Sequence, residues 1–100
     1  MAKMTGGQAI VRTLTGHGID VIFGLPGVQL DNTFDALFEA QNTIRTIHTR
    51  HEQGAAYMAL GYAQASGKVS ACIVGPGPGL LNAGAALCTA AASNVPVLCI

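Results

Sequence analysis

Short apolar strand patterns alternate with helical patterns along the whole of this 100-residue chain. Such alternation, with short connections, requires parallel strands that are joined by right-handed crossovers through helices. Four strands are predicted, at residues 20–23, 43–49, 69–74 and 95–100. Their mostly apolar composition is typical of strands that are buried on both faces. The sequence therefore predicts an α/β fold, a doubly wound parallel sheet with helices on both faces.

Four segments with helical spacing accompany these strands. The first covers roughly residues 5–17, where Thr5 and Gln8 have the spacing of a capping box. The second follows the Pro26-Gly27 turn, and the others cover residues 51–66 and 80–92. The apolar residues that repeat at helical spacing in the first three are Ile10, Val11 and Leu14; Leu30, Phe34, Leu37 and Phe38; and Ala55, Met58, Ala59 and Tyr62.

The distribution of charge limits what this chain can bind. Five basic and five acidic residues cancel, so no electrostatic footprint for nucleic acid or an anionic membrane is present. After Lys68 no charged residue follows through Ile100. That run is long enough to span a membrane, but its prolines and glycines divide it into pieces that are too short. We therefore expect neither nucleic acid nor membrane as a partner, and we expect other protein to cover this stretch.

The cysteines and histidines do not form a metal site by their spacing. Cys72, Cys88 and Cys99 lie in apolar runs without CxxC spacing, which indicates buried free thiols in a reducing cytoplasm. His48 and His51 flank a predicted junction between strand and helix, and no acidic or thiol cluster completes a site. No metal ligand is therefore predicted in this chain.

Ligands of such a sheet bind beyond the carboxyl ends of the strands, so three loops are candidates, at residues 24–29, 50–54 and 75–82. The glycine-rich loop lacks both GxGxxG and GxxxxGK[ST], and its prolines remove backbone donors that a phosphate would need. By itself, it favours a tight turn. Glu52, by itself, is an acid in the first turn of a helix, where it interacts favourably with the helix dipole.

Four motifs occur in order along the chain: Phe23-Gly24-Leu25-Pro26-Gly27, Arg50-His51-Glu52-Gln53-Gly54, Gly77-Pro78-Gly79-Leu80-Leu81-Asn82 and Val95-Pro96-Val97-Leu98. With them the chain resembles, over its whole length, the N-terminal pyrimidine-binding domain of thiamine-diphosphate enzymes related to acetolactate synthase, pyruvate oxidase and benzaldehyde lyase. This resemblance implies that residues 1–100 are the N-terminal part of that domain and that the other domains are absent from this chain. Because the last predicted strand reaches Ile100 without a turn, we also expect a longer protein.

The resemblance assigns roles to individual residues. It implies that Glu52 is catalytic, because the family's glutamate at this place hydrogen-bonds N1′ of the aminopyrimidine and stabilises its imino tautomer. The cofactor then acts as an electron sink for reactions of 2-keto acids or aldehydes. Val28 and Gln29 fall on the substrate side, where neither an acid nor a histidine is present, so the substrate stays open. The implied cofactor-binding residues are Pro26, Gly27, Glu52, Gly77, Gly79 and Asn82.

Two opposed effects act on the predicted Glu52 carboxyl group. The helix N-terminus favours the carboxylate, whereas burial beside Ala55 and Ala56 disfavours it and raises the pKa. We expect burial to dominate in the complete enzyme with cofactor bound, because the carboxyl group shares a proton with a ring nitrogen there.

The family resemblance also implies partners beyond this chain. A separate C-terminal domain of a partner subunit holds the diphosphate and Mg²⁺, and the full-length enzyme is a homodimer or homotetramer. The resemblance does not distinguish between ligation, decarboxylation and oxidation as the reaction, and it leaves FAD as a possible second cofactor. One alternative is a nucleotide-binding α/β module, although Thr49-Arg50 replace the acidic residue that NAD requires there. The other is a non-catalytic interaction domain, against which the presence of Glu52 counts.

Overall fold

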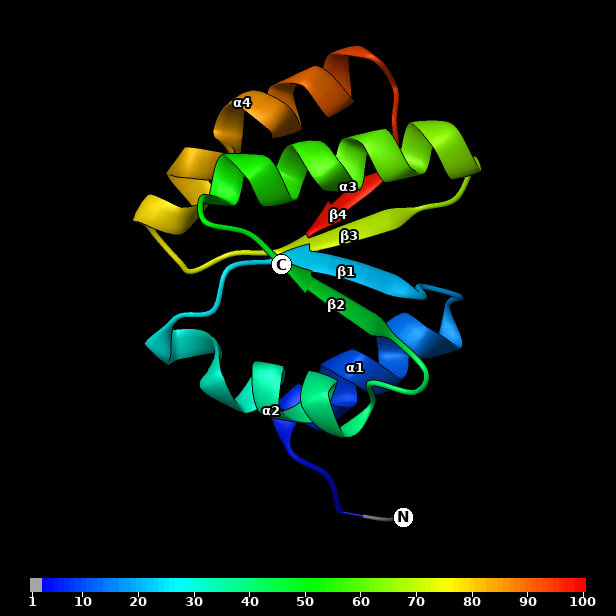
Figure 1. Ribbon diagram of the computed structural model, residues 1–100, viewed down its shortest axis with the longest axis vertical. Coiled ribbons are helices and arrows are strands. Elements are labelled where there is room, and N and C mark those ends of the chain that lie inside the picture. Colours follow the sequence, from blue (N-terminus) through cyan, green and yellow to red (C-terminus); the bar gives the residue numbers. More distant parts are fainter. Residues whose placement is uncertain (1–2) are drawn as a thin grey trace.

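A computed structural model describes residues 3–100 as one parallel four-stranded sheet with a layer of helices on each face (Figure 1). The strand order is β2-β1-β3-β4, and every pairing is parallel. The predicted fold class and all four predicted strands are confirmed. The elements are α1 (Gly6–Gly16), β1 (Val21–Gly24), the 3₁₀ helix η1 (Val28–Leu30), α2 (Asp31–Glu39), β2 (Arg45–His48), α3 (Glu52–Ser66), β3 (Ser70–Ile73), α4 (Pro78–Ala92) and β4 (Val97–Cys99).

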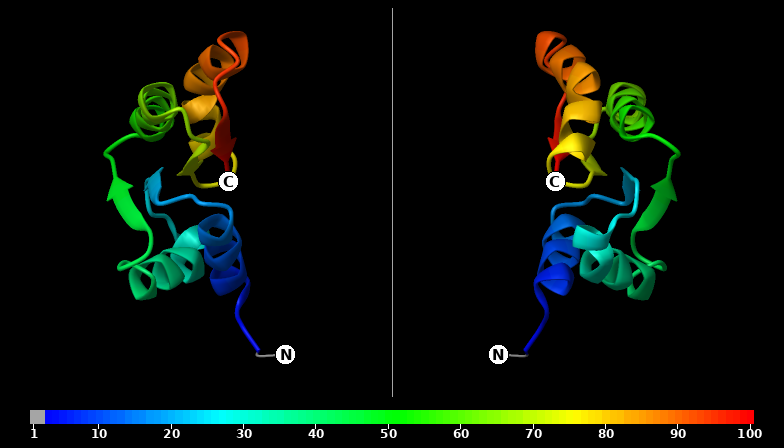
Figure 2. Two further views of the ribbon diagram at one scale, coloured as in Figure 1. Left: turned by 90° about the vertical axis from the view of Figure 1, so that its right-hand side faces the viewer. Right: turned by 90° about the vertical axis from the view of Figure 1, so that its left-hand side faces the viewer.

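The two helix layers enclose two separate cores. Helices α1 and α2 cover one face of the sheet and α3 and α4 the other, as the views in Figure 2 also show. The first core includes Leu14, Ile22, Leu37 and Ile44, and the second includes Phe23 together with alanines of α3 and α4. Because all strands run in the same direction, the loops that follow β1, β2 and β3 lie at one edge of the sheet.

Helices α3 and α4 pack through small side chains. The buried small residues are Ala55, Ala56, Ala59 and Ala63 of α3, and Gly79, Ala83, Ala86 and Ala90 of α4. Met58 lies beside this stripe and is 41% exposed, and Phe38 on α2 is 68% exposed, so helical spacing alone overestimated the width of both buried faces. Cys88 is also exposed, contrary to prediction, because it lies on the side of α4 away from Ala86 and Ala90.

The ends of two helices follow directly from their sequence. The predicted capping box of α1 is present: Gln8 N donates to Thr5 Oγ1 at 3.1 Å, and Thr5 N donates to Gln8 Oε1 at 3.0 Å. Helix α4 begins at Pro78, two residues before the predicted start at residue 80. Proline suits a first helical position because its missing N–H would have no partner there, so this proline starts the helix instead of ending the loop.

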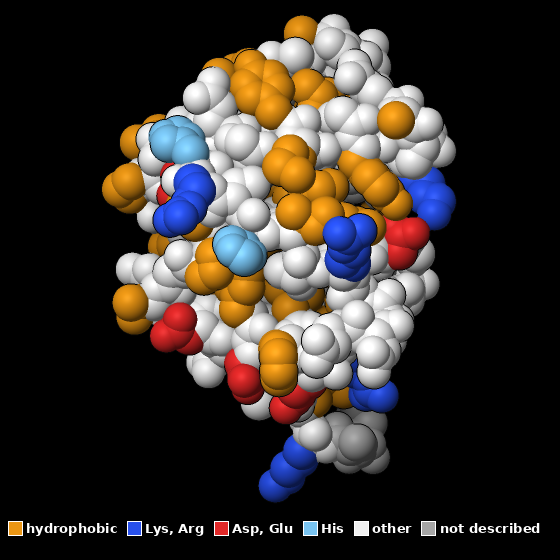
Figure 3. Space-filling view, viewed as in Figure 1, with side chains coloured by type: hydrophobic (Ala, Val, Ile, Leu, Met, Phe, Trp, Pro, Cys, Tyr) orange, Lys and Arg blue, Asp and Glu red, His pale blue; other side chains and the backbone are white. Residues whose placement is uncertain are grey.

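The segment without charges is distributed over β3, α4 and β4. Leu81 is 79% exposed and Leu80 is 48% exposed, so much of the apolar surface of α4 faces outward. Hydrophobic side chains accordingly spread over the upper part of Figure 3, where α3 and α4 lie. Within residues 3–100, no helix combines the length and the hydropathy that crossing a bilayer requires.

Two adjacent glycines of α1 predict opposite effects on stability. A Cβ on Gly7 would contact the backbone carbonyl of Asn32 in α2, whereas a Cβ on Gly6 meets nothing within 4 Å. We expect Gly7→Ala to lower the free energy of unfolding by roughly 1–3 kcal/mol. Gly6→Ala is the matched control and should stabilise by up to about 1 kcal/mol. Denaturant unfolding of both variants measures this, and equal stabilities would contradict the described packing of α1 on α2.

Candidate functional site

Glu52 is the first residue of α3, at the edge of the sheet where the strands end, and its side chain is partly buried. The preceding residue fixes the start of the helix: His51 Nδ1 accepts a hydrogen bond from Gln53 N at 3.0 Å. Thr49 Oγ1 donates to the His51 carbonyl at 2.7 Å. His51 therefore caps the helix, and these bonds determine where the Glu52 side chain leaves the backbone.

Three of the predicted site residues lie together. Asn82, in the second turn of α4, donates from Nδ2 to Glu52 Oε2 at 3.0 Å. Gly79, in the first turn of α4, lies beside the other carboxyl oxygen, since a Cβ built there would be 3.5 Å from Glu52 Oε1 and 3.7 Å from Cγ. The missing side chain of Gly79 thus leaves space next to Oε1 that an alanine methyl group would fill.

This environment favours the ionised form of Glu52. The hydrogen bond from Asn82 is the largest cause that lowers the pKa of Glu52, followed by a bond from its own backbone N–H. Partial burial acts in the opposite direction, and the charge of nearby His51 lowers the pKa further. In this chain by itself the pKa of Glu52 is therefore lowered, whereas a raised pKa is expected for the complete enzyme. The difference arises because Glu52 keeps contact with solvent and accepts a hydrogen bond from Asn82.

The loop after β1 forms the other side of this edge. Leu25 N donates to the Ile73 carbonyl at 3.4 Å, which holds the loop against the end of β3. Pro26 and Val28 are exposed, and Val28 is 83% exposed. Among the hydrogen bonds of residues 3–100, none joins this loop to Glu52. The structure thus places Pro26, Gly27 and Val28 at the same edge as Glu52 without joining them to it.

A cavity of about 390 Å³ separates Gln29 from the loop after β3. Its lining is mostly apolar, and Gln29 supplies a polar side chain at its rim. The residues around it follow β1 and β3 or lie at the end of β4, so the cavity is at the carboxyl edge of the sheet, which is the usual ligand position in such folds. The lining residues are Gln29, Leu30, Val74, Gly75, Pro76, Leu80, Cys99 and Ile100.

Gly77 acts on the site through the backbone. Its φ of 71° and ψ of −111° lie in a region that residues with a side chain rarely adopt. It caps α4 without a side chain, directly before Pro78, and so sets the direction in which Gly79 and Asn82 leave the loop. The prediction that Gly77 shapes a pocket thus has a structural basis in the turn, while its contact with a ligand stays a prediction.

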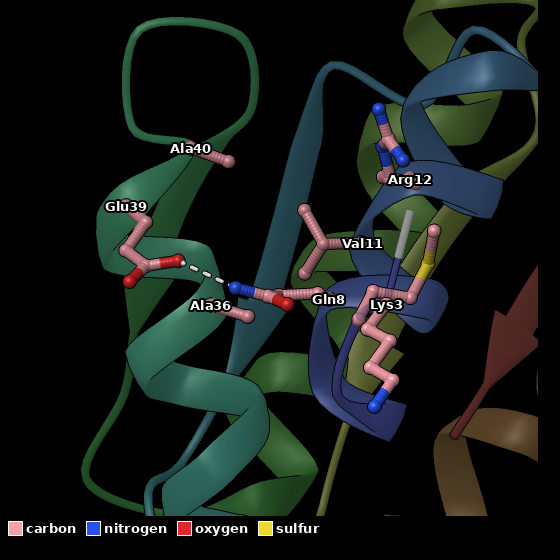
Figure 4. Close-up of a pocket in the computed structure, with 8 residues that line it drawn as sticks. Lys3, Gln8, Val11, Arg12, Ala36, Glu39 and Ala40 are labelled. Atoms are coloured by element: carbon pink, nitrogen blue, oxygen red, sulfur yellow. Dashed lines mark hydrogen bonds between the residues drawn. The ribbon is translucent and has the colours of Figure 1, made fainter. Parts of the chain in front are cut away.

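Other hollows and charged groups lie away from Glu52. A groove of about 310 Å³ between α1 and α2, on the opposite face of the sheet, contains Gln8 and Glu39, which hydrogen-bond each other at 3.2 Å (Figure 4). Asp20, before β1, pairs with exposed Lys68 at 3.2 Å. In the described part of the chain no three His, Cys, Asp or Glu residues gather as a metal site.

Comparison with known proteins identifies the family of this chain. Residues 4–100 match the family model "Thiamine pyrophosphate enzyme, N-terminal TPP binding domain". The chain belongs to this family. Thiamine pyrophosphate, also called thiamine diphosphate, is the cofactor of the family, and the match decides against the alternative of an NAD-type nucleotide module.

Relatives of this thiamine-pyrophosphate family cover nearly the whole chain. The probable 2-ketoarginine decarboxylase of Pseudomonas aeruginosa is 46% identical over 97% of the chain and 17% of its own length. The acetolactate synthase of Mycobacterium avium is 41% identical over 98% of the chain and 16% of its own length. The large subunit of acetolactate synthase isozyme 2 of Escherichia coli is 39% identical over 97% of the chain and 17% of its own length. The chain thus spans about a sixth of the length of these relatives.

The polar groups at Glu52 suit the aminopyrimidine part of thiamine pyrophosphate. A ring nitrogen that exchanges a proton needs a carboxyl oxygen that no side chain covers, and at Glu52 Oε1 the neighbouring Gly79 contributes no side chain. The Asn82 amide already binds Oε2, so the two carboxyl oxygens are not equivalent. This asymmetry was not visible in the sequence, although two helices that start at one edge of the sheet could have suggested that Glu52 and Asn82 meet.

Proposed function

We propose that the full-length protein is a thiamine-diphosphate-dependent carboligase or decarboxylase of 2-keto acids, and that this chain supplies the carboxyl group for the aminopyrimidine. The observation that carries the proposal is the Glu52 carboxyl group, held by Asn82 at 3.0 Å with Oε1 beside Gly79. The relatives, an acetolactate synthase and a probable 2-ketoarginine decarboxylase, support the same reaction class.

In this proposal each residue of the edge has a distinct task. Glu52 Oε1 meets N1′ and shares a proton with it, while the turns at Pro26-Gly27 and Gly77 and the bare Cα of Gly79 give the ring room. Val28 and Gln29 lie on the substrate side, and neither is charged. When bound, the cofactor supplies the electron sink for cleaving or forming a carbon–carbon bond.

The rest of the cofactor site belongs to other parts of the protein in this proposal. Residues 1–100 form the N-terminal part of the pyrimidine-binding domain, and a domain outside this chain holds the diphosphate and Mg²⁺. The three free cysteines support a reducing, cytoplasmic location.

The proposal is tested by assaying the purified full-length protein with pyruvate, longer 2-keto acids and aldehydes. We expect carbon dioxide release or a ligated hydroxyketone product that requires both thiamine diphosphate and Mg²⁺. The absorbance spectrum of the same preparation shows whether FAD is bound. Failure to bind thiamine diphosphate would contradict the proposal, as would cofactor binding without turnover of any such substrate.

The outer face of α3 and α4 supports a homo-oligomer. These two helices contain one charged residue, Glu52, and they expose Tyr57, Met58, Leu80 and Leu81. Apolar surface of this kind commonly marks an interface. We expect the full-length protein to be at least a homodimer, with α3 and its Glu52 near the subunit interface.

Sedimentation velocity at micromolar concentration with cofactor present checks this prediction. Leu81→Asp places a charge at the most exposed large apolar residue of this face and should weaken association at least tenfold, as loss of an interface anchor does. Phe38→Asp is the matched control, because Phe38 is 68% exposed on the opposite face. A monomeric wild-type protein would contradict the prediction, and so would equal association of the two variants.

A further inference from the structure

Asn82 and Glu52 are brought together by topology. Helix α3 follows β2 and helix α4 follows β3, and both begin at the carboxyl edge of the sheet and lie side by side (Figure 1). The bond of 3.0 Å between Asn82 Nδ2 and Glu52 Oε2 joins residues that are 30 positions apart. Among residues 3–100, Asn82 is the one side chain that hydrogen-bonds Glu52.

This bond distinguishes the two oxygens of the carboxyl group. The terminal torsion of a glutamate is soft, so an unheld carboxyl group would rotate over a broad range. With Oε2 bound to the amide, Oε1 is the oxygen beside Gly79, where a Cβ would lie 3.5 Å away. An amide N–H can only donate, so it stabilises an oxygen that carries no proton.

We propose that Asn82 is a positioning residue, which holds Glu52 Oε2 free of a proton and thereby leaves Oε1 as the oxygen that shares a proton with the pyrimidine nitrogen. This inference rests on the proposed function of Glu52. It gives Asn82 a different task from the direct contact with the cofactor that the sequence motif implied. Gly79 complements it, because it places no side chain against Oε1.

Few charged groups surround Glu52, so the hydrogen bond from Asn82 has the largest effect on its protonation. The bond from Asn82 is the largest cause of the lowered pKa of Glu52. The charge of His51, the residue that caps α3, acts in the same direction. Helix α4 and strand β3, which pack against α3, contain no charged residue. Removing Asn82 should therefore raise the pKa of Glu52.

The first test titrates the Glu52 carboxyl group in cofactor-free full-length protein by NMR with ¹³C-labelled glutamate, assigned by its loss in Glu52→Gln. We expect Asn82→Ala to raise the pKa of Glu52 and Asn82→Asp to raise it more, because a second carboxylate adds repulsion. Asn42→Asp makes the same change of charge on an exposed turn residue and should leave the titration unchanged. An unchanged titration in both Asn82 variants would overturn the inference.

The second test uses the loaded enzyme. Asn82→Ala should lower kcat roughly tenfold, the usual worth of one hydrogen bond to a charged group, and should move the acid limb of the pH profile to higher pH. In the Glu52→Gln background the same substitution should add little, since coupled residues are not additive. Full additivity would overturn the inference, because Asn82 would then act on the cofactor directly. If the protein turns over no 2-keto acid, the proposed function fails, and the titration still decides the role of Asn82.

Discussion

Glu52→Gln is expected to lower kcat of the full-length protein by about 10²–10⁴-fold, the usual worth of a positioned acid or base. Glutamine keeps the shape of the side chain and its capacity for hydrogen bonds, but it cannot share a proton at the position of Oε1. Because Glu52 is only partly buried, the fold should survive this change. Steady-state assays with a 2-keto acid measure the loss, and circular dichroism measures the fold.

Glu39→Gln is the matched control for this experiment. Glu39 is exposed at the end of α2, on the opposite face of the sheet, where it accepts a hydrogen bond from Gln8. We expect its kcat to stay at the wild-type value. Equal rates in wild type, Glu39→Gln and Glu52→Gln would show that Glu52 is a first-turn helix acid without a catalytic task.

Glu52→Ala is expected to weaken the binding of thiamine diphosphate roughly 5- to 150-fold, which corresponds to about 1–3 kcal/mol. The alanine leaves the ring nitrogen without its hydrogen-bond partner, and it leaves the Asn82 amide without its acceptor. Isothermal titration calorimetry of the full-length protein measures the dissociation constant. Glu39→Ala should bind as the wild type does, and a Glu52→Ala variant with wild-type affinity would contradict the assigned contact.

The sequence predicted the architecture well because periodicity reports burial. Continuous apolar runs placed the four strands to within about two residues at each end, and strict alternation required parallel pairing. The errors arose where tertiary packing determines the start of a helix or the burial of a side chain. Pro78 reads equally as a loop residue or as a first helical residue, and only the formed helix distinguishes these readings. Likewise, Phe38 and Met58 have helical spacing, but the neighbouring elements do not cover them.

The site was predictable in its members but not in its geometry. Motifs selected Glu52, Gly79 and Asn82, and the structure brings these three together. The sequence could not show that Asn82 binds one carboxyl oxygen while Gly79 leaves the other open, because that depends on how α3 and α4 pack. Nor could it assign the His51 ring to the helix cap, since Nδ1 reaches Gln53 N only in the folded turn.

The central claim is that the Glu52 carboxyl group activates the cofactor, and proton exchange at the thiazolium C2 tests it most directly. The full-length enzyme with bound cofactor is mixed with deuterium oxide, quenched in acid after set times and analysed by NMR. We predict that Glu52→Gln exchanges this proton about 10²–10⁴-fold more slowly than the wild type, whereas Glu39→Gln exchanges it at the wild-type rate. Exchange at the wild-type rate in Glu52→Gln would contradict the account.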